Sequence, residues 1–317
     1  MAVILPLRGL IIDLVTPLRD GGNIDGRGLG RLLDRVLPHV HGVFLASPYM
    51  GEGKGLGAQQ REELLEKALV VVQGRVPVLV WITGKTENET GNTLILLEKR
   101  LKKRKYDGPV LWVDTPLYYH SNRGLTTHYQ NLSSSCKFPF ILHNDPELIK
   151  EHARPLKRNN IRTSILKELT GAMSLKGLIY LGPLDRVGHY QKASRSRTDF
   201  RIYDGDESRF LDYPSMGGVV SAGANLSTKA WHKIATASLH MGESEKRYPD
   251  QLQQLWETGK YLRRLIDVYR SLPVPLIKQI LAELGIIETP ACTFKAENRG
   301  KDLARLKEVM RSHGDDA

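Results

Sequence analysis

The chain has 317 residues, a formal net charge of +11 and two cysteines, Cys136 and Cys292. This length suits either two average domains or one α/β barrel, since barrels of about 250 residues are common. Two cysteines and no signal-like start indicate a reducing, cytoplasmic location without a disulfide framework. No apolar run reaches the roughly 18 residues that a membrane-spanning helix needs, so we expect no membrane association.

The excess of positive charge raises the question of nucleic acid. The densest basic run is Lys99–Lys105, at the end of an expected helix, where cations complement the helix dipole. Aromatic residues are not interleaved with this charge and no nucleic-acid-binding module is recognisable, so nucleic acid is not an expected partner. The charge does favour encounters with anionic small molecules.

Strand-like apolar runs alternate with amphipathic stretches along most of the chain. Eight such runs, each followed by a helix-forming segment, predict parallel strands and a closed (β/α)8 TIM barrel, an α/β fold. The expected strands are Gly9–Leu18, Gly42–Ser47, Val76–Thr83, Pro109–Thr115, Phe138–Asn144, Thr163–Leu169, Arg201–Gly205 and Gly217–Ala222. The clearest amphipathic helices between them are Gln59–Val72, Glu87–Lys105 and Leu125–Ser134.

The sequence after the eighth expected strand is rich in helical patterns. Tyr248–Tyr269 is interpreted as one long helix and Pro275–Leu284 as another. Because a minimal barrel needs fewer helices, we expect residues 1–230 to form the barrel. Residues 231–317 are expected to form a C-terminal helical extension packed on it.

Lys167 is the most informative residue for function. It lies in the aliphatic run Thr163–Leu169, which we interpret as a buried parallel strand with a cation near its carboxyl end. That end of the strands carries the active site in (β/α)8 enzymes. An amine held among apolar neighbours loses its proton more readily, so it can attack a keto group and form a Schiff base. The alternative is a relic lysine on an inherited scaffold.

A series of motifs at the expected strand ends resembles the dihydrodipicolinate synthase and N-acetylneuraminate lyase family of class I aldolases. The motifs follow the family's order over residues 9–295. They are Leu14–Asp25, Gly51-Glu52, Thr115–Tyr119, His143-Asn144-Asp145-Pro146, Lys167, Asp204–Glu207, Gly217–Asn225 and Pro275-Leu276-Ile277-Lys278.

The resemblance implies roles for several positions, and some of them depart from the family pattern. The family's proton-shuttling tyrosine at the end of strand five is His143 here, a residue that can do acid–base chemistry. The two threonines that hold a keto-acid carboxylate fall on Tyr49 and Met50, and methionine offers no hydroxyl. Tyr118 resembles the relay tyrosine. The synthase's arginine after the fifth-strand motif has no counterpart, so strict synthase activity is not expected.

We therefore expect a class I, Schiff-base aldolase or lyase acting on pyruvate or another 2-oxo acid. The expected catalytic residues are Lys167, His143 and Tyr118. The expected substrate-binding residues are Tyr49, Met50, Gly51 and Ser221, with backbone N–H groups near the last two as carboxylate holders.

Three further expectations concern cofactors, partners and the rival function. No metal and no organic cofactor are expected, and His39 and His41 have no third ligand spaced for zinc. Family members are commonly tetramers, so the resemblance implies a homo-oligomer, either a dimer or a tetramer. The rival reading is a non-catalytic or regulatory small-molecule-binding protein that kept the barrel and lost the relay.

Overall fold

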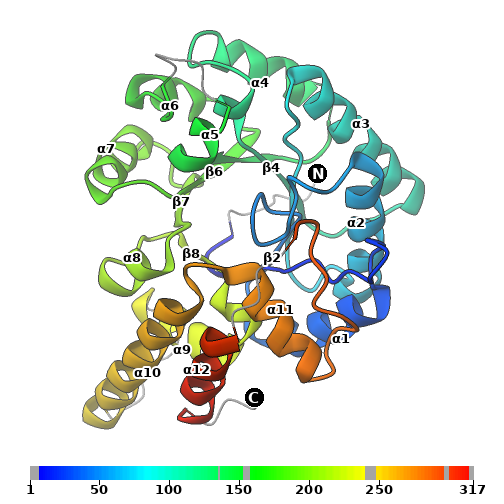
Figure 1. Ribbon diagram of the computed structural model, residues 1–317. Helices are drawn as coiled ribbons and strands as arrows, with labels where there is room; N and C mark the ends of the chain where they lie inside the picture. The colour runs from blue at the N-terminus through cyan, green and yellow to red at the C-terminus, as the bar shows by residue number, and fades with distance from the viewer. Residues whose placement is uncertain (1–6, 135, 153–157, 240–247, 296–299, 314–317) are drawn as a thin grey trace.

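Eight parallel strands form a closed barrel, and their order around the wall follows their order in the chain (Figure 1). This computed structural model describes residues 7–134, 136–152, 158–239, 248–295 and 300–313. The strands are β1 (Gly9–Asp13), β2 (Gly42–Leu45), β3 (Val78–Trp81), β4 (Val110–Asp114), β5 (Phe140–Asn144), β6 (Leu175–Tyr180), β7 (Arg201–Asp204) and β8 (Gly218–Ser221).

The barrel closes where β1 pairs with β8, with Gly9 opposite Gly218 and Ile11 opposite Val220. The seam requires glycine. Gly218 has a φ of +121°, and a Cβ atom there would lie 1.9 Å from the carbonyl oxygen of Gly9. Any side chain at Gly218 would therefore push the two closing strands apart.

Helices surround the strands, as Figure 1 shows. The α-helices are α1 (Gly26–Val36), α2 (Ala58–Val72), α3 (Glu87–Arg104), α4 (Leu125–Ser134), α5 (Pro146–Lys150), α6 (Thr163–Leu169), α7 (Leu184–Ser194), α8 (Glu207–Asp212), α9 (Thr228–Ser238), α10 (Tyr248–Tyr269), α11 (Pro273–Glu283) and α12 (Gly300–Arg311). Short 3-10 helices are η1 (Leu37–His39), η2 (Pro116–Tyr118) and η3 (Gly223–Asn225).

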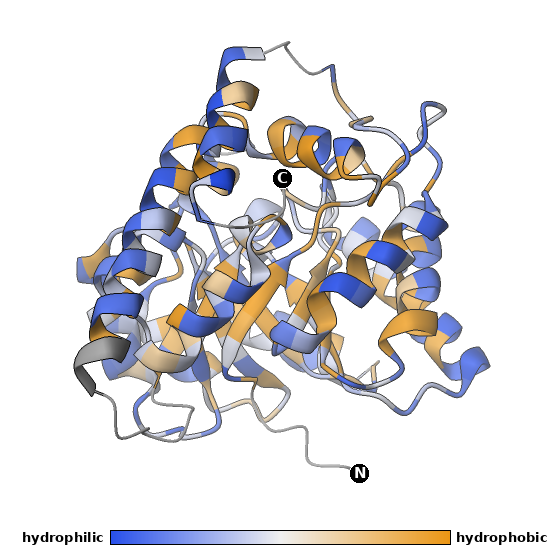
Figure 2. Cartoon of the chain, turned by 90° about the horizontal axis from the view of Figure 1, so that it is seen from below, coloured by the Kyte–Doolittle hydropathy of each residue, from blue (hydrophilic) through white to orange (hydrophobic). Residues whose placement is uncertain are grey.

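The alternation of strand side chains produces two hydrophobic cores. The larger one lies between the strands and the helices, whose hydrophobic faces turn inward while their hydrophilic faces meet solvent (Figure 2). The smaller one fills the barrel interior. Its strand residues are Ile11, Phe44, Leu79, Trp81, Leu111, Val113, Ile141, Ile179, Tyr203 and Val220.

Seven of the eight expected strands are confirmed, with shorter bounds, and the sixth is wrong. The run Thr163–Leu169 forms helix α6, because its apolar residues Leu166 and Leu169 lie three apart and both pack into the outer core. The true sixth strand, β6, follows it as Leu175–Tyr180. The expected helices Leu125–Ser134 and Tyr248–Tyr269 have the bounds predicted.

The C-terminal helices pack on one side of the barrel. Helix α9 contacts β1 and β8, so it serves as the helix after the eighth strand, and the expected boundary at residue 230 falls inside it. Helix α10 contacts α9 and α12, which form a layer outside the barrel (Figure 1). No helix in the described part of the chain is both long and apolar enough to cross a membrane.

Candidate functional site

The carboxyl ends of β5 and β6 meet in the barrel wall, where the sequence predicts the catalytic pair. His143 pairs in register with Ile179, so the two residues lie side by side at the same level. Ile141 and Ile179 belong to the barrel interior, and His143 shares the inward face because it lies two residues beyond Ile141. The neighbour of His143 on the sixth strand is therefore an isoleucine.

Lys167 lies elsewhere, and its predicted place at the end of a barrel strand is wrong. It is an exposed residue in the last turn of helix α6, on the outside of the barrel. Among the eight described strands the one lysine is Lys176, which faces away from the interior and pairs with Asp199 at 2.9 Å. The strands consequently offer no amine to the inside of the barrel.

His143 sits in a buried, uncharged hydrogen-bond chain. Its Nδ1 lies 2.9 Å from the hydroxyl of Thr115, and that hydroxyl accepts a hydrogen bond of 2.9 Å from the indole N–H of Trp81. Burial lowers the pKa of His143 to about 3, so the imidazole is neutral at physiological pH. The predicted acid–base residue is thus present in the interior, but it carries no charge there.

Tyr118 closes the rim beside this chain. Its ring makes edge contacts with Trp81 and with His152, at centroid separations of 6.4 and 4.4 Å. Burial, with a smaller effect of the Glu151 carboxylate, raises the pKa of its hydroxyl. A cleft of about 380 Å³ opens next to it. The lining includes Lys54, Arg61, Trp81, Thr83, Glu89 and Tyr118.

Arg61 packs on the indole of Trp81 in this cleft. Its guanidinium lies over the Trp81 ring, 4.7 Å from the centroid, and donates hydrogen bonds to the carbonyl oxygens of Gly53, Trp81 and Thr83. Burial lowers its pKa to about 10. Its donors are largely committed to the backbone, so it holds the ends of the β2 and β3 loops together.

The expected carboxylate-binding loop after β2 is bonded internally. The Gly51 N–H donates to the Ser47 hydroxyl at 2.8 Å, and the Gly51 carbonyl accepts from Thr16. Met50 is buried in the outer core, and Tyr49 is 40 % exposed with its hydroxyl on Glu151. The structure therefore does not bring these predicted residues together around a shared anion.

Ser221 is also engaged with the protein itself. Its hydroxyl donates to the carboxylate of Glu207, which accepts as well from the Gly223 N–H at 2.8 Å and from the Tyr269 hydroxyl at 2.6 Å. Burial raises the pKa of Glu207. The donors near Ser221 that we expected to bind a substrate carboxylate are thus hydrogen-bonded to the carboxylate of Glu207 instead.

Asp13, the last residue of β1, adds a second partly buried carboxyl group on this side. Burial raises its pKa to about 7, a hydrogen bond with Ser47 opposes the rise, and the nearby Glu207 adds to it. Its Oδ1 has no hydrogen-bond partner among the described residues. Sequence reasoning missed both acids as site residues, although each stands at the carboxyl end of a strand or in the loop after one.

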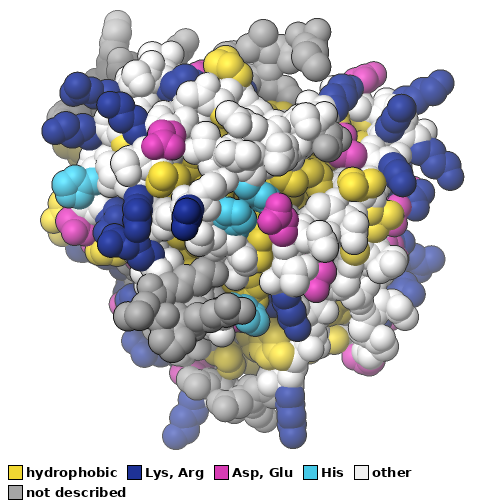
Figure 3. All heavy atoms as spheres, turned by 90° about the horizontal axis from the view of Figure 1, so that it is seen from above, with side chains coloured by type: hydrophobic (Ala, Val, Ile, Leu, Met, Phe, Trp, Pro, Cys, Tyr) yellow, Lys and Arg dark blue, Asp and Glu magenta, His cyan; other side chains and the backbone are white. Residues whose placement is uncertain are grey.

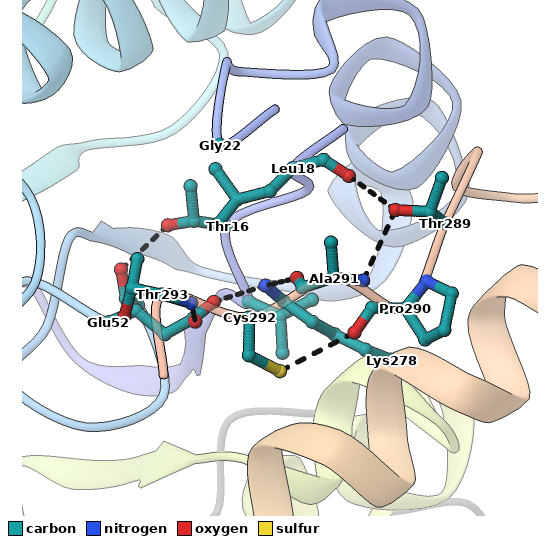
Figure 4. A network of polar contacts seen from close by, with 12 residues as sticks. Thr16, Leu18, Gly22, Glu52, Lys278, Thr289, Pro290, Ala291, Cys292 and Thr293 are labelled. Carbon is teal, nitrogen blue, oxygen red and sulfur yellow. Dashed lines mark hydrogen bonds and ion pairs between the residues drawn. The ribbon is translucent and has the colours of Figure 1, made fainter. Parts of the chain in front are cut away.

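A buried lysine does exist, but it lies on a C-terminal helix and forms an ion pair with a glutamate. Lys278 of α11 is fully buried, and its ammonium contacts the carboxylate of Glu52 and the carbonyl oxygen of Ala291 (Figure 4). The other Glu52 oxygen accepts from the Thr293 N–H at 2.6 Å. This pair ties the C-terminal segment after α11 to the loop after β2, and its amine is held as the partner of a carboxylate.

Comparison with known proteins places this barrel among characterised relatives. The model of the Dihydrodipicolinate synthetase family matches residues 6–294. A 4-hydroxy-tetrahydrodipicolinate synthase of Thermotoga neapolitana is 28 % identical over 312 residues, covering 97 % of this chain and 99 % of the relative. The synthase of Psychromonas ingrahamii is 27 % identical over 291 residues, covering 90 % and 91 % of the two chains.

Solved structures agree in fold. A monomeric dihydrodipicolinate synthase variant superimposes with a TM-score of 0.80 at 22 % identity, covering 98 % of each chain. Dihydrodipicolinate synthase of Thermotoga maritima gives a TM-score of 0.78 at 21 % identity, covering 98 % of this chain and 99 % of the other. The chain belongs to the Dihydrodipicolinate synthetase family, and this membership supports an activity of the lyase or aldolase class.

Proposed function

We propose that this chain is a divergent family member that binds a small molecule at the barrel mouth without forming a Schiff base. The observation that most directly supports this proposal is the pairing of His143 with Ile179 between β5 and β6. An imine requires a lysine amine within reach of the keto carbon. In the interior position beside His143, the sixth strand presents a hydrocarbon side chain.

No other lysine takes over this role in the described part of the chain. Lys167 is exposed on α6, Lys176 faces the helices, and Lys278 is sealed against Glu52. Lys54 and Lys85 line the cleft at the rim, where the Lys54 ammonium pairs with Glu151 and the Lys85 side chain is exposed. A lysine nucleophile must be a free amine that meets substrate, and each of these five is solvated, turned away or ion-paired.

The charges on the β8 and β1 side of the mouth also disfavour a ligand carboxylate there. Asp13 and Glu207 place two acidic groups on the β8 and β1 side, and His143 opposes them with no positive charge. Above about pH 7, where Asp13 is ionised, a ligand carboxylate on that side would meet like charge in a poorly solvated site, which costs free energy. We infer that the ligand presents an uncharged or cationic group there.

The decisive experiment is borohydride trapping. The wild-type protein, incubated with a panel of 2-oxo acids that includes pyruvate and then reduced with sodium borohydride, should show no stoichiometric adduct by intact mass. Ile179→Lys is the matched gain-of-function variant, because it places an amine beside His143, and it should acquire an adduct at residue 179. A stoichiometric adduct on any native lysine of the folded wild type, Lys54 included, overturns the proposal.

A second measurement addresses the charge of the ligand. Thermal shifts with pyruvate and with pyruvamide compare a carboxylate and an amide on the same skeleton. At pH 8, where Asp13 is ionised, the amide should stabilise the protein more than the acid does. A larger shift with the carboxylate would contradict the inferred ligand charge while leaving the trapping result to decide the chemistry.

The expected homo-oligomer remains a proposal as well. Family ancestry supports a dimer or tetramer, while one structural neighbour is described as a monomeric variant. Light scattering coupled to size exclusion measures the mass directly. A particle of 35.7 kDa, the mass of one chain, would contradict the oligomer.

A further inference from the structure

Two histidines and a glutamate meet outside the barrel, between α3 and α4. Glu87 lies in the first turn of α3, His120 follows η2, and His128 lies on α4. One candidate ligand atom from each residue lies within 4.8 Å of the other two. Figure 3 looks onto this side of the molecule, where histidine and acidic side chains lie next to each other on the surface.

The hydrogen bonds around His128 fix which nitrogen faces this cluster. The Tyr119 hydroxyl donates its proton to the Asp114 carboxylate at 2.8 Å, so its oxygen accepts from Nε2–H of His128, also at 2.8 Å. The Nδ1 atom then points at the Glu87 carboxylate, 3.1 Å away. Two acceptors at that distance need a cation between them, either a proton or a metal ion.

His120 is arranged in the same way. Its Nδ1 lies 2.7 Å from the carbonyl oxygen of Ser121, which can only accept, so Nδ1 carries the proton and Nε2 has a free lone pair. Histidines that bind metals nearly always donate their other N–H to a carbonyl, a carboxylate or a similar acceptor. His120 does this through Ser121, and His128 does it through Tyr119 and the buried Asp114.

We propose that Glu87, His120 and His128 form a binding site for a divalent transition-metal ion such as Zn²⁺. Two imidazoles and a carboxylate are a donor set that suits zinc, with water in the remaining position. The site revises the expectation of no metal drawn from the sequence. It is independent of the barrel interior and of the proposed function, and it would join the start of α3 to α4.

Accessibility and spacing are compatible with loading from solvent. The His128 side chain is only 3 % exposed and is held by Tyr119, whereas the Glu87 side chain is 61 % exposed. Two ligands at metal distances of about 2.1 Å lie at most about 4.2 Å apart. The His120 ring is stacked on the His128 ring, with centroids 4.9 Å apart, so the half-buried His120 must reorient on loading as the exposed Glu87 carboxylate does, while the buried imidazole of His128 stays in place.

Zinc titration by calorimetry tests the site on the full-length protein after chelator treatment. The expected result is one saturable site, and Glu87→Gln and His120→Ala should each weaken it at least about tenfold. His189→Ala removes an exposed histidine outside the cluster and is the matched control, with unchanged affinity expected. Circular dichroism checks that each variant is folded.

One further variant separates a built site from chance binding to surface histidines. Tyr119→Phe leaves all three ligands in place but removes the acceptor for His128, and it should weaken binding by about 10- to 100-fold. The absence of saturable binding, or unchanged affinity in Glu87→Gln and His120→Ala, overturns the proposal.

Discussion

The two sides of the barrel mouth carry different ionisable groups, and desolvation shifts the pKa of these groups in opposite directions. On the β5 and β6 side, His143 is kept neutral beside Ile179 because burial lowers its pKa to about 3. On the β8 and β1 side, Asp13 and Glu207 are partly buried near each other, and desolvation raises the pKa of both. Desolvation disfavours the charged form in each case, so a base and an acid shift in opposite directions.

The two sides also differ in role: one has a hydrogen-bond network that supports the fold, and the other lacks the amine that Schiff-base catalysis would need. The acidic side is a dense network in which Glu207 satisfies three donors, and it serves the closure of the barrel around Ser221 and Gly223. The side of β5 and β6 has a single titratable group beside a hydrocarbon, so it lacks the nucleophile while retaining a polar contact. The stability of the protein should therefore depend on pH in opposite directions through the two sides, and single variants can separate the two effects.

The largest effect is expected from Glu207→Leu. This change leaves the Ser221 hydroxyl, the Gly223 N–H and the Tyr269 hydroxyl without their acceptor, and each unsatisfied buried donor costs about 1–3 kcal/mol. We expect a loss of about 6 kcal/mol in the free energy of unfolding, measured by urea denaturation. Glu207→Gln keeps an acceptor oxygen and should lose much less. Equal losses in the two variants would show that the donors do not depend on this carboxylate.

His143→Gln should change how stability depends on acid. The histidine has its ordinary pKa of 6.5 in the unfolded chain and about 3 in the folded protein, so the unfolded chain binds more protons between these values. Its contribution is therefore complete above pH 6.5 and is lost as the pH falls toward 3, by at most about 5 kcal/mol. Glutamine does not titrate, so urea denaturation from pH 7 to pH 4 should give a flatter profile. Parallel profiles would mean that His143 is not buried as a neutral base.

Asp13→Asn should act at the other end of the pH scale. The folded protein binds the Asp13 proton up to about pH 7 and the unfolded chain only up to about pH 3.8, so wild-type stability falls as the pH rises through this window. Ionisation costs the folded state at most about 4 kcal/mol at pH 8. We expect the variant to be more stable than wild type at pH 8 and nearly equal to it at pH 4. Stabilisation that does not vary with pH would contradict the raised pKa.

The barrel could be predicted from the sequence because the alternation of apolar runs and amphipathic stretches is visible within short segments of the chain. The prediction of the sixth strand was wrong because it relied on the same local pattern. Thr163–Leu169 and Leu175–Tyr180 are both short aliphatic runs that contain one lysine, and only packing decides that the first is a helix. The choice mattered because it moved the presumed nucleophile from a solvent-exposed helix into the barrel.

The candidate site was predictable only where a motif carried it. His143 follows from the strand-five motif. Glu207 stands in the expected strand-seven motif, but its raised pKa, like that of Asp13, comes from burial that segments far apart in the chain create together. The cluster of Glu87, His120 and His128 has no regular spacing, because α3, η2 and α4 meet only in the folded chain. Long-range contacts of this kind leave no local pattern.

The smallest effect is expected from Lys167→Ala. The side chain is exposed on α6, and surface substitutions of this kind usually change stability by less than about 0.5 kcal/mol. The variant should also match the wild type in borohydride trapping, and in the Ile179→Lys background it should leave the new adduct intact. Loss of an adduct on removing Lys167 would mean that this lysine reaches the mouth after all. The side of β5 and β6 would then hold an amine, and its contrast with the acidic side would disappear.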